Sequence, residues 1–96
     1  MIVRVFQVSV YENKVDAFQK FFIETAMPLM QRQPGLVSLT AGLPRPETPT
    51  EFCMVMVWDN VESLRAFAGD DGQQPHIAED EVDLVRERRL AHYELA

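Results

Sequence analysis

The side chains that most often carry catalysis are scarce in this sequence. It has two histidines, His76 and His92, and a single cysteine, Cys53. Cys53 lies in the apolar run FCMVMVW, which predicts a buried thiol without a cationic neighbour to activate it. No serine stands in the strand-to-helix elbow that nucleophilic hydrolases use. Catalysis through a covalent intermediate is therefore not expected.

Metal and nucleotide sites are not predicted either. One cysteine and two distant histidines lack the ligand spacing of a zinc or iron–sulfur site. The four glycines are scattered and form no phosphate-binding loop. With 15 acidic against nine basic side chains, the formal charge is −6, and no run of Lys and Arg could follow a nucleic acid backbone. We expect neither a metal nor a nucleic acid partner.

The hydrophobic pattern predicts neither a membrane-spanning helix nor a signal peptide. No stretch approaches the ~18 consecutive apolar residues of a membrane helix. The first residues, MIVRVFQVSV, alternate instead of forming the basic flank and long apolar stretch of a signal peptide. We expect a cytoplasmic protein with no membrane partner.

The elements that must position the candidate residues are indicated by hydrophobic spacing. Residues 2–10 are apolar on both alternating sets, which predicts a strand covered on both faces. Asn13 is the expected cap of a helix that runs to about residue 32, and Pro28 predicts a kink near residues 24–27. The apolar positions of this helix recur at three- and four-residue spacing, namely Val15, Phe18, Phe22, Ala26 and Leu29. A second stripe, Ile23, Met27 and Met30, is interpreted as additional core.

The second half of the chain repeats this order. Residues 36–43 alternate with one polar side, which predicts an edge strand, and 51–58 form the most apolar strand. Asp59 or Asn60 is expected to cap a helix that Gly69 ends. A further short helix is predicted over 76–87, and a last strand over 88–96.

The resulting order, β-α-β-β-α-β, predicts a single α+β domain over residues 1–96 with a ferredoxin-like fold and a four-stranded antiparallel sheet. Right-handed crossovers place the first and third strands in the centre, and these are the two that are apolar on both faces. Two helices can cover only one face of such a sheet. We therefore expect a homodimer in which a second copy covers the other face.

Three segments of the sequence are similar to those of a known family: VMVWDNVESLRAFAG, PHIAEDE and the closing HYE. With the order of elements, these segments resemble the antibiotic biosynthesis monooxygenase family, which consists of dimeric α+β barrels. That family includes quinone-forming oxygenases without a cofactor and heme-degrading enzymes. The resemblance implies that Trp58 lines a pocket and that His76 lies near the position of the iron-ligating histidine of the heme-degrading members. Those members have an asparagine on the first strand, where this chain has Gln7.

For a cofactor-free oxygenase, the protein would supply a dry aromatic pocket, polar groups that stabilise an anionic substrate, and a path for a proton. We predict His76, Asn60 and Gln7 as the catalytic polar groups. The predicted substrate-binding residues are Trp58, Phe18, Phe22, Met56, Phe67 and Tyr93. Each has an alternative interpretation: Trp58 suits a core position, His76 an exposed turn, and His92 a structural place in the last strand.

Three functions remain open from the sequence. The first is a monooxygenase without a cofactor that acts on a small aromatic or quinol-type compound. The second is a dimeric barrel without catalysis that binds a small apolar ligand in the same pocket. The third is a heme-binding and heme-degrading monooxygenase, with heme as its cofactor and His76 reaching the iron.

Overall fold

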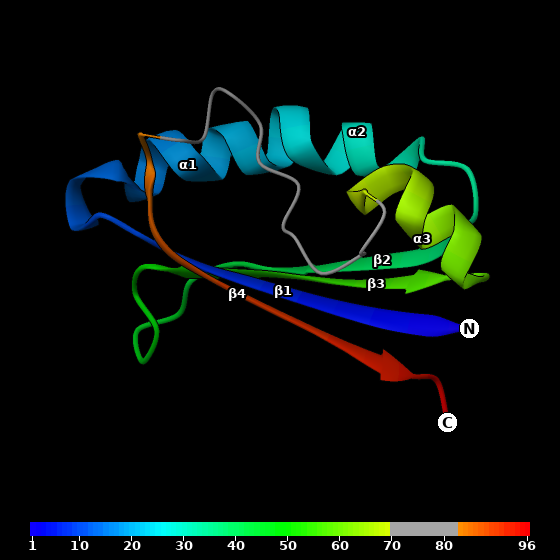
Figure 1. The fold of residues 1–96 in the computed structure, drawn as a ribbon. Coiled ribbons are helices and arrows are strands. Elements are labelled where there is room, and N and C mark those ends of the chain that lie inside the picture. Colours follow the sequence, from blue (N-terminus) through cyan, green and yellow to red (C-terminus); the bar gives the residue numbers. More distant parts are fainter. Residues whose placement is uncertain (70–82) are drawn as a thin grey trace.

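The computed structural model describes residues 1–69 and 83–96. It is an α+β fold in which helices lie on one face of a four-stranded antiparallel sheet, as Figure 1 shows. The strands are β1 (Ile2–Val10), β2 (Leu36–Gly42), β3 (Glu51–Trp58) and β4 (Val85–Glu94), in the order β2-β3-β1-β4. The predicted fold class is confirmed, with β1 and β3 in the centre.

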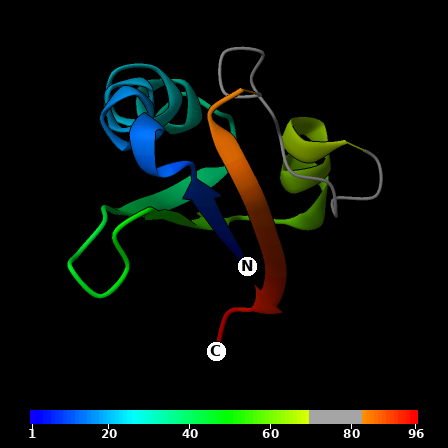
Figure 2. The same ribbon diagram turned by 90° about the vertical axis from the view of Figure 1, so that its left-hand side faces the viewer.

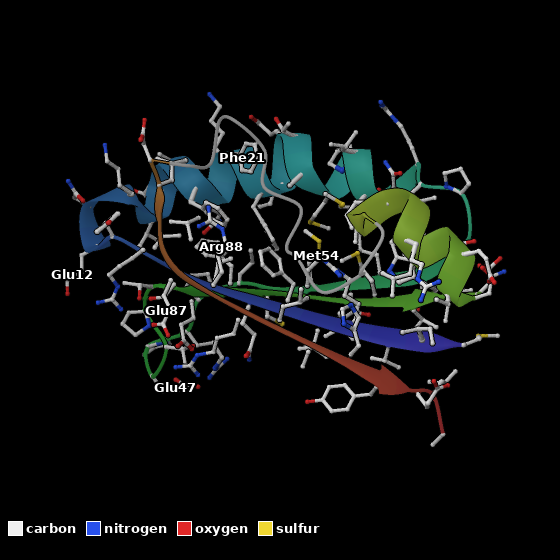
Figure 3. The ribbon with its side chains drawn as sticks, in the orientation of Figure 1. Glu12, Phe21, Glu47, Met54, Glu87 and Arg88 are labelled. Carbon is white, nitrogen blue, oxygen red and sulfur yellow. The ribbon has the colours of Figure 1, made fainter. Side chains whose placement is uncertain are left out.

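The register of the central strands sorts their side chains onto two faces. Arg4 is opposite Met56, Phe6 is opposite Met54, and these side chains share the face that the helices cover. Figure 3 shows Met54 in the space between the sheet and the helices. The neighbouring positions, such as the pair Val5 and Val55, point to the other face, where they are only partly buried. Figure 2 shows that no described helix covers that face.

The first helical segment is interrupted where the sequence predicted a kink. It consists of η1 (Glu12–Lys14), α1 (Val15–Phe21), the π-helical turn η2 (Phe22–Ala26) and α2 (Met27–Gln31). The backbone N–H of Met27 donates to the carbonyl of Phe22, one residue further back than in an α-helix. Pro28 has no N–H to continue the α-helical ladder and its ring needs room against the preceding turn, so the wider turn precedes it.

Two details of this segment differ from the expectation. Asn13 is not a cap: it lies inside η1, which starts after Tyr11 and has no side-chain cap. The cause is the short 3-10 turn that joins β1 to α1. Met30 is buried, whereas Leu29 is 40% exposed and Ile23 is 44% exposed. The wider π-helical turn lets the buried side chains follow at four-residue spacing from Phe22 through Ala26 to Met30, so the stripe ends on Met30 and not on Leu29.

The connection from α2 to the sheet depends on Gly35, which has φ of 85°. Its carbonyl accepts a hydrogen bond from the N–H of Asp59 at 2.9 Å. A Cβ on Gly35 would lie 2.2 Å from Oγ of Ser63, so only glycine lets the chain approach helix α3 (Val61–Ala68) this closely. Asn60 caps α3, because its Oδ1 accepts from the N–H of Ser63 at 2.8 Å. The capping prediction for this helix is confirmed.

The last strand starts earlier than predicted. β4 begins at Val85, so residues 85–87 belong to a strand and not to the helix expected over 76–87. Val85 is 6% exposed and pairs with Val10 across a register shift, and this pairing outweighs the local helical pattern. Residues 76–82 of the expected helix lie outside the described part. No helix within the described ranges is long and apolar enough to span a membrane.

Candidate functional site

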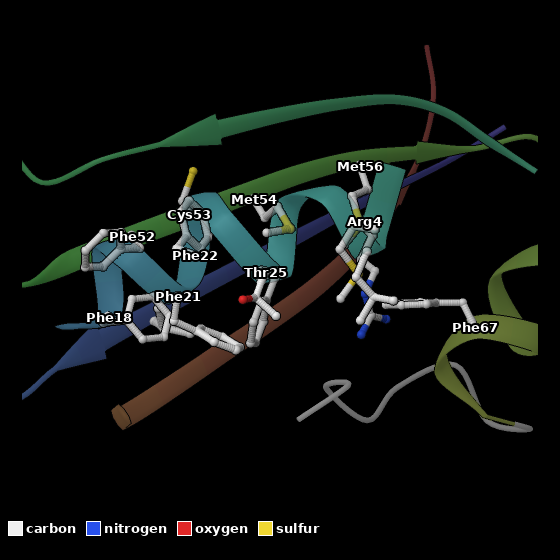
Figure 4. Close-up of a pocket in the computed structure, with 15 residues that line it drawn as sticks. Arg4, Phe18, Phe21, Phe22, Thr25, Phe52, Cys53, Met54, Met56 and Phe67 are labelled. Atoms are coloured by element: carbon white, nitrogen blue, oxygen red, sulfur yellow. The ribbon is translucent and has the colours of Figure 1, made fainter. Parts of the chain in front are cut away.

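A cavity lies between the helical layer and the sheet, and Figure 4 shows the side chains around it. The space between its side chains amounts to about 620 Å³ when the open solvent at its mouth is included. Its walls come from β1, β3, the first helical segment and α3. Most of them are aromatic or sulfur-containing, including Phe18, Phe22, Phe52, Met54, Met56 and Phe67.

One end of the cavity is an aromatic cluster. The ring of Phe18 lies 4.7 Å from that of Phe52 and 5.8 Å from that of Phe22, and Phe22 lies 5.3 Å from Phe52. Phe18 and Phe22 are four residues apart and so share one side of the helical segment. All three rings are buried, so this end has a fixed shape made by packing.

The opposite end contains a buried charge, Arg4, which sequence analysis did not select. Arg4 is 1% exposed and lines the cavity beside Phe67. Its guanidinium carbon lies 5.6 Å from the centre of the Phe67 ring, close enough for a cation–π contact. Burial lowers the pKa of Arg4 to about 10, so it remains protonated at neutral pH. The sequence could have indicated this residue, because Arg4 is a charged residue within the alternating set of the first strand that contains Phe6 and Val8 and is otherwise apolar.

Arg4 is held by His92, its partner in the register of β1 and β4. The distance from Nη1 of Arg4 to Nε2 of His92 is 2.8 Å. A guanidinium can only donate, so Nε2 of His92 accepts and the imidazole is neutral with its proton on Nδ1. Burial, and next the charge of Arg4, lower the pKa of His92. The prediction that His92 belongs to the last strand is confirmed, and its contact with Arg4 was not foreseen.

Four of the predicted substrate-binding residues are brought together by the fold. Phe18, Phe22, Met56 and Phe67 all line the cavity. Trp58 does not: it is fully buried behind Phe67, with the two rings stacked at 5.1 Å and 27°. Its Nε1 has no hydrogen-bond partner within the described ranges. The structure thus gives Trp58 a supporting place, while binding by the other four stays a prediction.

The remaining predicted residues do not meet at the cavity. Gln7 is exposed and Tyr93 is 58% exposed, and both lie on the sheet face away from the helices. The alternation of strand side chains explains this, because Gln7 is odd in a strand whose even positions face the cavity. Asn60 is used as the cap of α3, and His76 lies outside the described residues.

Cys53 is partly exposed, in contrast to the buried thiol expected, because it lies on the sheet face that no described helix covers. In the described parts of the chain, no group of three or more His, Cys, Asp and Glu side chains could hold a metal ion. Among the described residues, the cavity therefore offers aromatic walls and one charged side chain, Arg4, which His92 supports.

Comparison with known proteins connects this arrangement to a family. The chain resembles a protein from Shewanella oneidensis (18% identity, TM-score 0.77, covering 96% of this chain and 87% of that one). It also resembles a variant of SnoaB, a cofactor-independent oxygenase from Streptomyces nogalater (22%, 0.74, 98% and 91%). A third similar structure is the heme-degrader MhuD from Mycobacterium tuberculosis (17%, 0.70, 99% and 95%).

These identities are low, so the similarity of structure shows a shared fold. A search of curated protein sequences found no match. The family model for antibiotic biosynthesis monooxygenase, however, matches residues 1–79, which is most of the chain. The chain therefore belongs to the antibiotic biosynthesis monooxygenase family.

Proposed function

We propose that this protein is a monooxygenase that works without a prosthetic group and oxidises a small aromatic or quinol-type compound. The observation that carries the proposal is the cavity itself, which has aromatic walls at one end and buried Arg4 at the other, where partly buried His92 accepts a hydrogen bond from the guanidinium. Membership of the family supports the reaction class. SnoaB, which shares the fold, is a cofactor-independent oxygenase.

The chemistry suits such a site because the substrate can supply all the electrons. A quinol that has lost a proton transfers electrons to O₂ more readily than the neutral quinol does. One oxygen atom then enters the ring and the other leaves in water, while a ring C–H becomes C–OH and the quinol becomes a quinone. No external reductant is needed for this balance. The protein has to bind the anion, exclude water and orient the ring.

The described side chains match these tasks. The rings of Phe18, Phe22 and Phe52 provide apolar surface for an aromatic substrate and for O₂. The guanidinium of Arg4 places a positive charge in the cavity wall, and burial strengthens the effect of a charge on a negative oxygen relative to water. His76 could act in proton transfer as the sequence predicted, and this assignment is part of the proposal.

Oxygen uptake with a panel of benzene and naphthalene hydroquinones tests the proposal. We expect uptake that depends on the protein, incorporation of one atom from labelled O₂ into a hydroxyquinone, and no accumulation of peroxide. Phe67→Ala, in the cavity wall, should reduce the rate, whereas Tyr11→Ala, an exposed aromatic outside the lining, should not. Saturable binding of the quinols without any catalysed uptake would instead identify a barrel that only binds ligands.

Heme is not part of this proposal, because the described donors do not fit it. The described residues of the cavity lining include no histidine, and Nε2 of His92 is already used by Arg4. A Soret shift that saturates at one heme per chain and is lost in His76→Ala would contradict this assignment. Heme titration of the wild type and of that variant therefore checks it.

We also propose that the protein acts in the cytoplasm as a homodimer. The support is the sheet face opposite the helices, where Val3, Val5, Val55, Val57 and Ala91 are only partly buried. A second copy of the same face would cover these side chains and form a two-fold interface.

A further inference from the structure

We propose that Arg88 binds a carboxylate carried by an aromatic ligand of the cavity, through the Nε and Nη2 atoms of its guanidinium. The inference adds a substituent to the ligand of the proposed function, and it rests on that proposal for the reaction. Binding of such a ligand is nevertheless measured without turnover, so the two statements succeed or fail separately.

The first argument is that two nitrogens of Arg88 have no partner. Nε and Nη2 each expose less than 1 Å² to solvent, and neither has a hydrogen-bond acceptor within the described ranges. The ion pairs found in those ranges are formed by Arg45 and Arg89 and do not involve Arg88. Buried donors of a charged group that lack acceptors cost free energy, and an anion at this place would remove that cost.

The other arginines of β4 show that this lack of a partner is particular to Arg88. Nη2 of Arg86 donates to Oγ of Ser9 at 3.0 Å. Nε of Arg89 donates to Oε1 of Glu87 at 3.4 Å. Each of these two guanidinium groups thus uses a side-chain oxygen on its own or a neighbouring strand, and the described residues offer no such oxygen to Arg88.

The second argument is which two nitrogens lack a partner. The N–H groups of Nε and Nη2 point to the same side of the planar guanidinium, and they form a pair that binds both oxygens of one carboxylate. A single acceptor, such as a carbonyl or a hydroxyl oxygen, would leave one of these donors unused. The two unpartnered atoms of Arg88 therefore match a carboxylate, and bidentate pairs of this kind are among the stronger hydrogen bonds in proteins.

The third argument is the position of Arg88 beside the cavity. Arg88 is opposite Val8 in the register of β1 and β4, so its side chain lies on the helix side of the sheet. Val8 lines the cavity, and Figure 3 shows Arg88 extending from β4 toward the helical layer. A ligand whose ring lies against the phenylalanine side chains of the cavity can therefore bring a substituent of that ring to Arg88.

Access to the guanidinium follows from the partial burial of the residue as a whole. Arg88 is half-buried, so it lies near the surface although Nε and Nη2 are covered. An arginine side chain is long and flexible, and rotation of its bonds can turn the covered edge of the guanidinium toward an anion without moving the strand. Binding therefore exchanges two unused donors for a charge-assisted pair.

The probe that tests the inference is 2-naphthoate, with 2-naphthamide as a neutral compound of nearly the same shape. Calorimetric titration gives the affinity of the protein for each compound. We expect the wild type to bind 2-naphthoate about tenfold or more tightly than 2-naphthamide. Arg88→Gln removes the charge and the paired donors, so it should weaken 2-naphthoate binding about tenfold or more and leave the affinity for 2-naphthamide within about twofold.

Arg89→Gln is the matched control, because Arg89 lies on the same strand and projects from the opposite face of the sheet. It should change the affinity for 2-naphthoate by less than about twofold. Arg88→Lys keeps the charge without a fixed pair of donors, so it should retain only part of the preference for 2-naphthoate. Equal effects of Arg88→Gln and Arg89→Gln would reduce the preference to a general effect of net charge and overturn the inference.

The wild type alone can overturn the inference, so the test does not depend on the folding of any variant. No saturable binding of 2-naphthoate, or equal affinities for the two compounds, would exclude a carboxylate site at Arg88. An equal loss of both compounds in Arg88→Gln would assign a structural role to Arg88 and exclude the site as well. If 2-naphthoate is preferred but quinols cause no oxygen uptake, carboxylate binding stands and the oxygenase proposal fails.

Discussion

Burial lowers the pKa values of both Arg4 and His92, but the two groups end in different protonation states at neutral pH. Arg4 stays charged despite the cost of burial, since a pKa of about 10 is still well above neutral pH. The pKa of His92 is lowered as well, by burial and next by the positive charge of Arg4, and this favours the neutral imidazole. The hydrogen bond between them therefore joins a permanent donor to an acceptor that loses its lone pair when it is protonated.

This arrangement predicts a loss of stability in acid. The unfolded chain takes up a proton on His92 near its ordinary pKa of 6.5, whereas the folded protein resists protonation until a lower pH. The stabilisation is therefore complete above pH 6.5 and is lost as the pH falls through the folded-state pKa. Urea unfolding at several pH values should show a fall in the free energy of unfolding below about pH 6.5 that is smaller in His92→Gln. Equal falls in both proteins would contradict the prediction.

The helices and strands could be predicted from the sequence because their signals are local. The alternation of residues 51–58 identified β3, Asn60 marked the start of α3, and Pro28 marked the irregular turn. What could not be predicted depends on contacts between distant segments. The pair of Arg4 and His92 is 88 residues apart along the chain, and β4 begins at Val85 because it pairs with β1.

The predicted site was less accurate than the fold for the same reason. Spacing along the helix correctly associated Phe18 with Phe22 in the cavity wall, since they are neighbours on one helical segment. The sequence could not show that Phe67 stands between Trp58 and the cavity, because that depends on how α3 packs on the sheet. Gln7 was selected by type, although the strand alternation places it on the opposite face.

The same substitution should reduce the stability of the protein by different amounts at two glycines, one of which lies where α2, β2 and α3 meet. Both Gly35 and Gly69 have positive φ, 85° and 100°. A Cβ on Gly35 would meet the side chains of Ser63 and Asp59, whereas one on Gly69 would meet nothing within 4 Å. Gly69→Ala should cost about 1–3 kcal/mol of stability through backbone strain, because its φ of 100° and ψ of 172° suit only glycine, and Gly35→Ala should cost about 1–3 kcal/mol more because a steric clash is added. Thermal or chemical unfolding of both variants measures the difference, and equal losses would show that the junction can relax.

At the scale of the whole molecule, one face of the sheet is not covered by any helix of the described residues. The central strands carry Val5 opposite Val55 there, with Tyr93 on the edge strand β4 exposed at 58%. A face of this kind on a chain of 96 residues is the natural partner of an identical face, because a small domain buries too little apolar surface by itself. The cavity lies on the other side of the sheet, so association through this face would leave its described lining accessible.

Three aspartate substitutions distinguish this assembly from a monomer. Light scattering of the wild type at micromolar concentration should give about twice 11.0 kDa. Val55→Asp, on the uncovered face, should dissociate the dimer, because an unpaired charge within an interface costs several kcal/mol. Ile23→Asp, on a helical position that is 44% exposed, should leave the mass unchanged. Met54→Asp, which is 4% exposed under the helices, should unfold the chain instead of dissociating it. A wild type of 11.0 kDa, or a Val55→Asp variant that keeps the doubled mass, would exclude the uncovered face as the interface.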